Sequence, residues 1–553
     1  MYDVCIIGSG AGAGPVAYEL AHNGQRVLVL EKGHYYTRED FFKDELAIRR
    51  DVYTPPLTQQ QHVIQTQNEK GQWISVQAKD SNWNFWNGSM VGGSSNLMSG
   101  YFLRLKPNDF KLKTVYGGVK DTNIVDWPIS YNDLEPYYDK VEKIVGVSGK
   151  VVQHPYMEPR SSKDFPFPPL WEQPISSWID NACKKLDYHV FPTPRAILPY
   201  PALGRLGCSY SNFCGSYGCA TGAKGNARSA LLDSAVKTGN CTIISDAFAF
   251  KIDSDSKRAT KVSYFDKNNN IQNIQAKIFV IACQAIETSR LLLNSKNVHF
   301  PNGLLNNYNQ VGKNLIFSAG GTGHGTFEFA NLQKSKHKDL MVRGAFVNRT
   351  IQDWYEFENN GKKIKGGGID FLYEGANPTY RAMTQIYDKN SKLIWGVKLQ
   401  QKLKHAFLSS RVLNFEIFND WSPTDNCYVS VDESVRDKWG IPVGLIRLNS
   451  NPHDEMVGSF LAQKAVNVLK QMGAIDIQTN ISPSPSTNLQ AGGCRFGDDE
   501  KSSVLDKNCK AHALDNLYVT DGSFMPTGGS VPYTFTIYAN SFRVADVIKR
   551  RFG

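Results

Sequence analysis

Apolar residues fall in short runs at both ends of the chain. Residues 4–7 form one run, and an amphipathic stretch then leads to a second run at 27–30. The stretches 278–282 and 516–522 repeat the pattern near the middle and the end of the chain. Short apolar runs bounded by turn residues are typical of buried parallel strands alternating with helices. The pattern predicts an α/β fold whose parallel sheet is assembled from distant segments.

The pattern changes between about residues 320 and 485. Alternation of apolar and polar residues at 326–329, 406–418 and 427–431 predicts strands of an antiparallel sheet, and residues 454–472 predict one long helix. We therefore expect a first domain at 1–320, with a covering region at about 35–225, a second domain at 321–485, and a return to the first at 486–553. A helix is expected at 536–551, within that return.

Composition limits the class of protein. The chain has 553 residues, of which 41% are hydrophobic and 21% charged, as in globular proteins of at least two domains. No apolar run approaches the roughly 20 residues of a transmembrane helix. The first strand begins within a few residues of Met1 and leaves no room for a signal peptide. We expect a cytoplasmic protein, with export to the periplasm alongside a partner subunit as the alternative.

Charge and cysteine content exclude two further classes. The net charge of +10 is spread among acidic residues without a basic block, so no nucleic-acid partner is expected. The ten cysteines are dispersed in a chain without a predicted signal, so a disulfide framework is not expected either.

The glycine-rich stretch after the first run carries the clearest chemistry. It reads GSGAGA, in which Gly8, Gly10 and Ala13 follow the G-x-G-x-x-G/A pattern between a strand and a helix. Such glycines allow a tight turn and a close backbone approach to a pyrophosphate at the helix N-terminus. Glu31 ends the second strand at the distance expected for an acceptor of a ribose hydroxyl. The motif predicts a dinucleotide and leaves NAD and FAD both open.

A second glycine- and serine-rich stretch, NGSMVGGSS at 87–95, offers backbone and hydroxyl donors to phosphate. Together with the N-terminal motif, IACQAIETSRLLL at 281–293 and NLYVTDGSFMPTGG at 516–529, it resembles the glucose–methanol–choline (GMC) family of flavoprotein oxidoreductases. The segment DWPISYNDLEPYYDKVE at 126–142 is similar to the dehydrogenase branch of that family. The resemblance implies a Rossmann-type FAD-binding domain made of discontinuous segments and an α+β substrate domain on an antiparallel sheet.

The same resemblance implies the cofactor contacts. FAD would be bound without a covalent bond, because Leu97 stands where some members attach it through histidine. The residues carried over as its contacts are Gly8, Gly10, Gly12, Ala13 and Glu31 at the adenosine and pyrophosphate, Gly92, Gly93 and Ser94 near the pyrophosphate and ribityl chain, and Asp521, Gly522, Tyr533 and Thr534 towards the ribityl chain and flavin ring.

The activity implied is oxidation of a CH–OH group. Dehydrogenation of a sugar, sugar acid or other polyol is expected, with electrons passing to a small subunit and a cytochrome or quinone. An oxygen-reducing alcohol oxidase and an FAD-binding homologue that does not oxidise alcohols stay open as alternatives.

The chain departs from the family at the reaction centre. Leu489 stands where the family has a histidine, and Pro532 where it has a second histidine or an asparagine. Neither side chain accepts a proton, whereas alcohol oxidation needs an acceptor. Tyr533, Gln490 and Asn488 are the nearby polar candidates for that role. Otherwise the substrate needs little base catalysis, or the protein does not oxidise alcohols.

Three cysteines lie close together in the sequence, at Cys208, Cys214 and Cys219. Three thiolates in a glycine-rich loop are potential ligands of an iron–sulfur cluster or of zinc. A similar triplet holds a three-iron cluster in sugar dehydrogenases of the family, although the spacing differs. Structural cysteines without a metal are the alternative.

Overall fold

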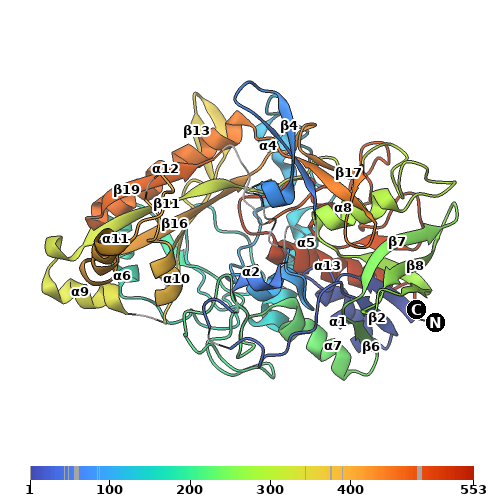
Figure 1. The fold of residues 1–553 in the computed structure, drawn as a ribbon, viewed down its shortest axis with the longest axis horizontal. Helices are drawn as coiled ribbons and strands as arrows, with labels where there is room; N and C mark the ends of the chain where they lie inside the picture. Colours follow the sequence, from blue (N-terminus) through green and yellow to red (C-terminus); the bar gives the residue numbers. More distant parts are fainter. Residues whose placement is uncertain are drawn as a thin grey trace.

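The computed structural model describes most of the chain. The described residues are 2–42, 44–47, 49–54, 61–81, 83, 85, 87–342, 344–373, 377–388, 390–482 and 489–553. They form one parallel sheet, one mixed sheet and several antiparallel sheets (Figure 1).

The parallel sheet has the order β20-β10-β1-β2-β6. The central strand is β1 (Tyr2–Ile7), which pairs in parallel with β2 (Val27–Leu30) and β10 (Ala276–Ile281). The edges are β6 (Cys241–Ile244) and β20 (Leu517–Val519). Because these strands come from both ends and the middle of the chain, the prediction of a discontinuous Rossmann-type sheet is confirmed.

Helices from distant segments cover this sheet. The first, α1 (Gly14–His22), packs against α13 (Thr534–Lys549), which in turn packs against α5 (Tyr131–Val141). Figure 1 shows α13 in dark red beside the dark blue α1, with both termini at the same end of the molecule. Glu19 joins the three helices, since it accepts from Lys140 at 2.7 Å and from Lys549 at 2.8 Å.

A six-stranded antiparallel sheet forms the second layer. Its order is β19-β11-β16-β15-β12-β5. The bounds are β19 (Ile475–Ile481), β11 (Ser318–Glu328), β16 (Ser410–Asp420), β15 (Gly367–Leu372), β12 (Arg349–Ile351) and β5 (Val190–Pro192). Leu413, Phe415 and Ile417 point from one face into a core shared with α12 (Pro452–Met472) and α6 (Ile175–Leu186). The predicted antiparallel sheet and long helix are both present.

The expected strand at 427–431 belongs to a different sheet. It lies in β17 (Tyr428–Arg436), which pairs with β18 (Pro442–Arg447), and β18 pairs with β3 (Val63–Gln67) from the N-terminal part of the chain. The expectation that this strand shares one antiparallel sheet with the strands at 326–329 and 406–418 is therefore wrong. Alternation of residues shows that a strand has one buried face, but it does not reveal which sheet the strand joins.

The remaining elements are short. Among the strands are β4 (Trp73–Gln77), β7 (Phe248–Ser254), β8 (Ala259–Phe265), β9 (Ile271–Ile274), β13 (Glu356–Asn359) and β14 (Lys362–Lys365). The helices are α2 (Arg50–Tyr53), α4 (Leu112–Tyr116), α7 (Asp233–Lys237), α8 (Ala285–Asn294), α9 (Lys334–Met341), α10 (Pro378–Met383) and α11 (Gly396–Lys404).

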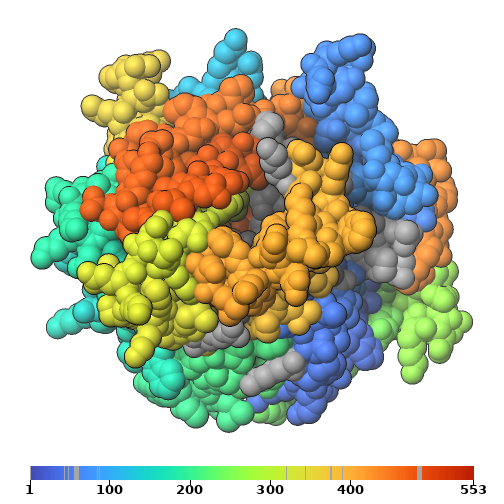
Figure 2. Space-filling model, turned by 60° about the vertical axis from the view of Figure 1, so that its left-hand side comes forward, coloured from blue at the N-terminus to red at the C-terminus, as the bar shows by residue number. Residues whose placement is uncertain are grey.

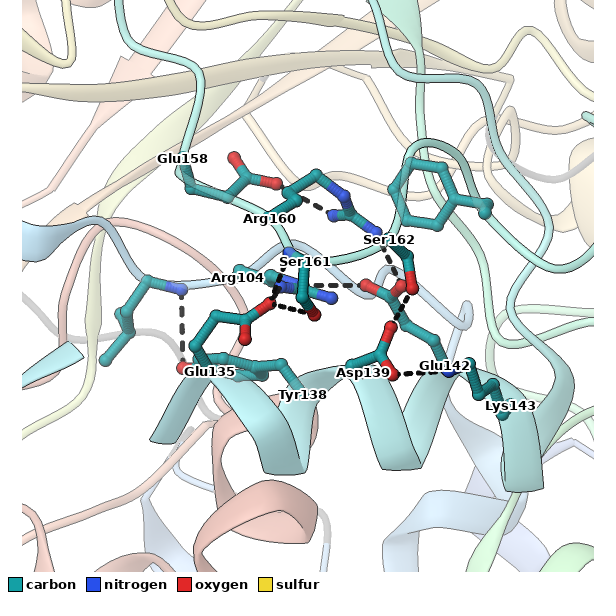
Figure 3. A network of polar contacts seen from close by, with 12 residues as sticks. Arg104, Glu135, Tyr138, Asp139, Glu142, Lys143, Glu158, Arg160, Ser161 and Ser162 are labelled. Atoms are coloured by element: carbon teal, nitrogen blue, oxygen red, sulfur yellow. Dashed lines mark hydrogen bonds and ion pairs between the residues drawn. The ribbon is translucent and has the colours of Figure 1, made fainter. Parts of the chain in front are cut away.

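A buried ion-pair network fastens part of the covering region to α5 (Figure 3). Arg104 donates to Glu142 at 2.8 Å and to Glu135 at 2.9 Å, while Arg160 pairs with Glu142 and Glu158. Each carboxylate faces at least one guanidinium, so these buried charges are compensated. The network holds the loop around residue 160 on the helix that supports α13.

Candidate cofactor and substrate site

A cavity of about 280 Å³ lies at the carboxyl ends of β1, β2 and β10. Ligands of open parallel sheets bind at this edge. Of the predicted cofactor contacts, the residues that line it are Gly8, Gly10, Gly12, Glu31, Gly93, Ser94, Asp521, Gly522, Tyr533 and Thr534. The structure thus brings together residues that are up to 526 positions apart in the sequence. Ala13 and Gly92 lie behind this lining, where Ala13 is fully buried.

The three glycines of the N-terminal motif have different surroundings. A Cβ on Gly8, whose φ is +95°, would lie 2.3 Å from the carbonyl oxygen of Ala282. One on Gly12 would lie 2.6 Å from the amide nitrogen of Asp521. A Cβ on Gly10 meets only the Cα of Gly93, at 3.9 Å. Gly8 and Gly12 are therefore required by packing, and Gly10 leaves open space in front of the N-terminus of α1.

Glu31 is buried and joins the first two strand ends. Its carboxylate accepts from the amide and hydroxyl of Ser9, at 3.1 and 2.5 Å, and from the amide of Gly33 at 2.8 Å. Burial raises the pKa of Glu31, although these hydrogen bonds oppose the rise. The Ser9 hydroxyl also accepts from the amide of Gly92 at 2.9 Å. Ser9 therefore links Glu31 to Gly92 and holds the two glycine-rich loops against each other.

The polar lining of the cavity fits a phosphate-bearing dinucleotide. The side-chain amide nitrogen of Asn87 is buried in the wall and has no acceptor among the described residues. A buried donor left unpaired costs about 1–3 kcal/mol, which a ligand oxygen would recover. The open space at Gly10, this amide and the N-terminus of α1 together match a pyrophosphate.

A second, larger cavity of about 1070 Å³ adjoins the first. Arg50, Met98, Leu489 and Thr534 line both cavities, and Pro532 lines the larger one. Leu489 and Pro532, the two positions at which the resemblance implies proton acceptors in the family, therefore lie at or beside the junction. Leu489 adopts a left-handed conformation with φ of +57°.

Comparison with known proteins agrees with this geometry. Residues 170–317 and 423–541 match the N- and C-terminal GMC oxidoreductase models. The chain is 27% identical to 2-methyl-1,2-propanediol dehydrogenase of Mycolicibacterium austroafricanum, over 100% of this chain and 96% of that protein. It is 26% identical to the fructose dehydrogenase large subunit of Gluconobacter japonicus, over 99% and 97% of the two chains. The solved structure of pyridoxine 4-oxidase from Mesorbium loti superposes with a TM-score of 0.60 at 17% identity, covering 100% of this chain and 99% of that one.

The chain carries the N- and C-terminal domains of GMC oxidoreductases. These domains imply FAD as the cofactor, and together with the dehydrogenase relatives they make the protein a flavin-dependent oxidoreductase. None of its described helices is long and apolar enough to cross a membrane.

Gln284 is a residue of this GMC site that the sequence did not single out. It follows β10 with φ of +80°, and its side chain caps α8 by accepting from the amides of Ile286 and Glu287. The backbone amide of Gln284 donates to the Asp521 carboxylate at 3.1 Å. Its side-chain nitrogen donates to the side-chain oxygen of Gln490 at 2.6 Å. A strained conformation held by four hydrogen bonds often marks a functional position. Only the three-dimensional structure reveals such strain at a glutamine.

The proposed proton acceptors have existing partners. Tyr533 is buried and donates its hydroxyl proton to the carbonyl oxygen of Phe317 at 2.5 Å, and burial raises its pKa well above the usual value. Gln490 donates to the carbonyl oxygen of Phe85 at 2.9 Å. Asn488 lies outside the described residues. The geometry does not favour Tyr533 or Gln490 as the group that takes the proton of an alcohol.

Replacing Tyr533 with phenylalanine tests this conclusion. We expect turnover with the best substrate to change less than about twofold. The free energy of unfolding should fall by about 1–3 kcal/mol, because the Phe317 carbonyl loses its donor inside the protein. Steady-state kinetics and urea unfolding measure the two quantities. A loss of turnover above about a hundredfold with unchanged stability would restore Tyr533 as the acceptor.

The cysteine triplet does not form a metal site in the structure. Within the described part of the chain, no group of three or more His, Cys, Asp or Glu side chains is placed to share a metal ion. The Cys208 sulfur accepts from the amide of Tyr210 at 3.4 Å, and the Cys219 sulfur lies 3.5 Å from the Thr221 hydroxyl. Burial raises the pKa of Cys208 to about 12. The predicted iron–sulfur cluster or zinc ion is therefore not supported, because these sulfurs contact their own loops.

Polar side chains cross the face of the six-stranded sheet opposite α12. Residues opposite one another in neighbouring strands include Asn480, Thr322, Glu416, Asp370 and Thr350. The first three line the larger cavity, and Asp370 is buried beside them. Side chains in register on adjacent strands share one face, so the sheet presents a hydrogen-bonding surface to the larger cavity.

Asp370 is expected to make stability depend on pH. Burial raises its pKa to about 6, above the 3.8 of an exposed aspartate. The folded state then keeps a proton that the unfolded state loses, so the free energy of unfolding falls as pH rises from about 4 to 6, by about 3 kcal/mol in total. Asp370→Asn should remove this component. Urea unfolding at pH 4.5 and 7.5 measures it, and a difference between the two proteins that is independent of pH contradicts the assignment.

Proposed function

We propose that the protein is an FAD-dependent dehydrogenase of a polyhydroxylated alcohol such as a sugar, sugar acid or other polyol. The observation that carries the proposal is the junction at Met98, Leu489 and Thr534, where a dinucleotide cavity adjoins a larger cavity. The larger cavity is lined by hydroxyl, amide and carboxylate groups, including Thr322, Glu416 and Asn480. Such groups bind substrate hydroxyls by hydrogen bonding.

FAD, when bound without a covalent link, supplies the acceptor for a hydride from the CH–OH carbon. The chain's own residues hold it. The open space at Gly10 and the amide of Asn87 would receive the pyrophosphate, and Glu31 would share an oxygen with a ribose hydroxyl. Asp521, kept in place by Thr288 and Gln284, would lie beside the ribityl chain.

The proton of the alcohol needs an acceptor other than the usual histidine. Leu489 and Pro532 carry no acceptor, and Tyr533 and Gln490 are bonded to backbone carbonyls. We assign the proton to water, or to a polar side chain of the larger cavity. Neutral water is a weak base and hydroxide a strong one, so the reaction should accelerate with rising pH as hydroxide becomes available, without the plateau of an imidazole.

Electrons are proposed to leave through a partner rather than to oxygen. The similarity to a dehydrogenase named as a large subunit supports a small subunit and a cytochrome or quinone acceptor. Co-export of the chain with such a subunit would place it in the periplasm. Without that subunit, the cytoplasm is the proposed compartment.

The test is anaerobic reduction of the bound flavin, followed by its absorbance, with sugars, sugar acids, polyols and simple diols. Bleaching by a hydroxylated substrate is expected, followed by slow reoxidation in air and fast reoxidation by a quinone or by ferricyanide. A flavin that stays oxidised with every substrate refutes the dehydrogenase. Reoxidation by oxygen at the rate of turnover would instead assign the protein as an oxidase.

A further inference from the structure

A basic lobe, residues 377–412 without 389, projects beside the mouth of the larger cavity. It contains α10, a hairpin turn and α11. Figure 2 shows this lobe in orange at the front of the molecule, beside blue residues of the N-terminal segment. Asn377 and Tyr380 line the larger cavity, and Arg49 lies over the Tyr380 ring at 4.1 Å. The lobe is therefore part of the cavity entrance.

Internal contacts show that the lobe is folded. Arg381 lies 4.5 Å over the ring of Phe407 and donates to the carbonyl oxygen of Ala406. The amide of Ile394 donates to the carbonyl oxygen of Ile386 at 2.7 Å, and Lys402 donates to that of Tyr387 at 2.6 Å. The backbone that carries the exposed side chains is thus held by contacts within the lobe.

Large apolar side chains remain exposed on this folded lobe. The exposed fractions are 63% for Leu393, 80% for Trp395, 68% for Val397 and 64% for Leu408. Val397, Gln401 and Lys404 follow the i, i+4, i+7 spacing of one face of α11, and Leu408 lies in the π-helical turn that follows it. Phe42 and Leu46 are also exposed, and Glu45 between them accepts from the amides of Thr379 and Tyr380 at the start of α10. Several large exposed apolar side chains on one folded lobe mark an interaction site.

The charge on the lobe identifies the chemistry of its partner. Between residues 389 and 415 the sequence has six Lys or Arg residues and no Asp or Glu. Lys392, Lys398 and Lys404 are exposed around the apolar side chains. Two copies meeting through this surface would bring like charges together, which disfavours a symmetric dimer. A tryptophan and aliphatic tips surrounded by lysines match a bilayer surface with anionic headgroups.

We propose that the basic lobe docks the protein on an anionic lipid bilayer. The apolar tips enter the boundary between headgroups and acyl chains, and the lysines lie among the lipid phosphates. Docking places the entrance of the larger cavity next to the lipid, where a lipophilic electron acceptor or substrate would reach it. This docking does not depend on which alcohol the protein oxidises.

The test is co-sedimentation of the full-length, flavin-loaded protein with vesicles of phosphatidylcholine, alone or with about 30% phosphatidylglycerol. We expect binding at least about tenfold tighter to the anionic vesicles, and release when salt rises from about 0.1 to 0.5 M. Lys398→Glu with Lys404→Glu, and separately Trp395→Ser with Leu408→Ser, should each weaken binding by about tenfold or more.

A matched control changes the same charge elsewhere. Lys257 and Lys267 are exposed in the turns that flank β8, at the opposite end of the molecule from α11 (Figure 1). Lys257→Glu with Lys267→Glu should bind vesicles as the unaltered protein does. Equal binding by all variants, or no binding to anionic vesicles, overturns the proposal. The proposal is also overturned if the unaltered protein is an oligomer that does not bind vesicles, and if Trp395→Ser with Leu408→Ser converts that oligomer to a monomer.

Discussion

Replacing Gly10 with valine is expected to give a folded protein that purifies without flavin. The nearest atom to a Cβ at this position is the Cα of Gly93, at 3.9 Å, so the apoprotein has room for the side chain. That space is where a pyrophosphate would approach the backbone, and the isopropyl group would fill it. Affinity for FAD should fall by at least about a hundredfold, equivalent to about 3 kcal/mol.

Flavin content after purification and titration of the apoprotein with FAD measure this loss. Gly118→Val is the matched control, because a Cβ at Gly118 meets nothing within 4 Å and this glycine lies outside both cavities. The melting temperatures of both apoproteins should stay within about 3 °C of the unaltered apoprotein. Full occupancy of the Gly10 variant by FAD would show that the dinucleotide does not approach this backbone.

Replacing Leu489 with histidine is expected to accelerate reduction of the bound flavin. The position lies at the junction of the two cavities, so an imidazole there would face both the cofactor and the substrate. A positioned general base contributes about 10²–10⁴-fold, and we expect at least about a hundredfold at pH 8. As pH rises, the rate should increase with an apparent pKa of about 6.5, which is that of an unperturbed imidazole.

The backbone at this position tolerates the change. Leu489 has φ of +57°, and histidine enters the left-handed region more readily than leucine does. Leu203, an exposed leucine with φ of +51° outside both cavities, provides the control variant Leu203→His. Stopped-flow absorbance under anaerobic conditions measures the rates. If Leu489→His binds FAD and substrate but reduces flavin at the original rate, the reacting carbon does not lie at this junction.

The family resemblance predicts that Leu489 and Pro532 replace the usual proton acceptors, which would change how this site works. The cofactor half retains its glycines, Glu31 and Asp521. Ser9 donates to Glu31, and Thr288 and Gln284 donate to Asp521. The reaction half has Leu489 and Pro532, which cannot accept a proton, and the neighbouring Tyr533 donates its proton to a backbone carbonyl. Binding of FAD and removal of the proton therefore depend on separate sets of residues, which the two variants above probe independently.

The sequence by itself determined the elements and the cofactor motif. Residues 4–13 are local, because a strand, a tight turn and a helix N-terminus need only neighbouring residues, and β1 and α1 form as expected. The helix predicted at 454–472 is α12 (Pro452–Met472), and the apolar runs at 278–282 and 516–522 contain strands of the same parallel sheet. Short-range patterns were sufficient for these features.

Only the tertiary structure decided which distant segments meet. The pairing of β17 with β18, and of β18 with β3, is not encoded in the alternation of either segment, because alternation specifies a face and not a neighbour. The strain at Gln284 and the hydrogen bond of Tyr533 likewise depend on contacts across the fold. The sequence alone predicted a dinucleotide site. Packing placed Leu489 and Pro532 at or beside the junction with the larger cavity, and showed which neighbouring groups already have partners.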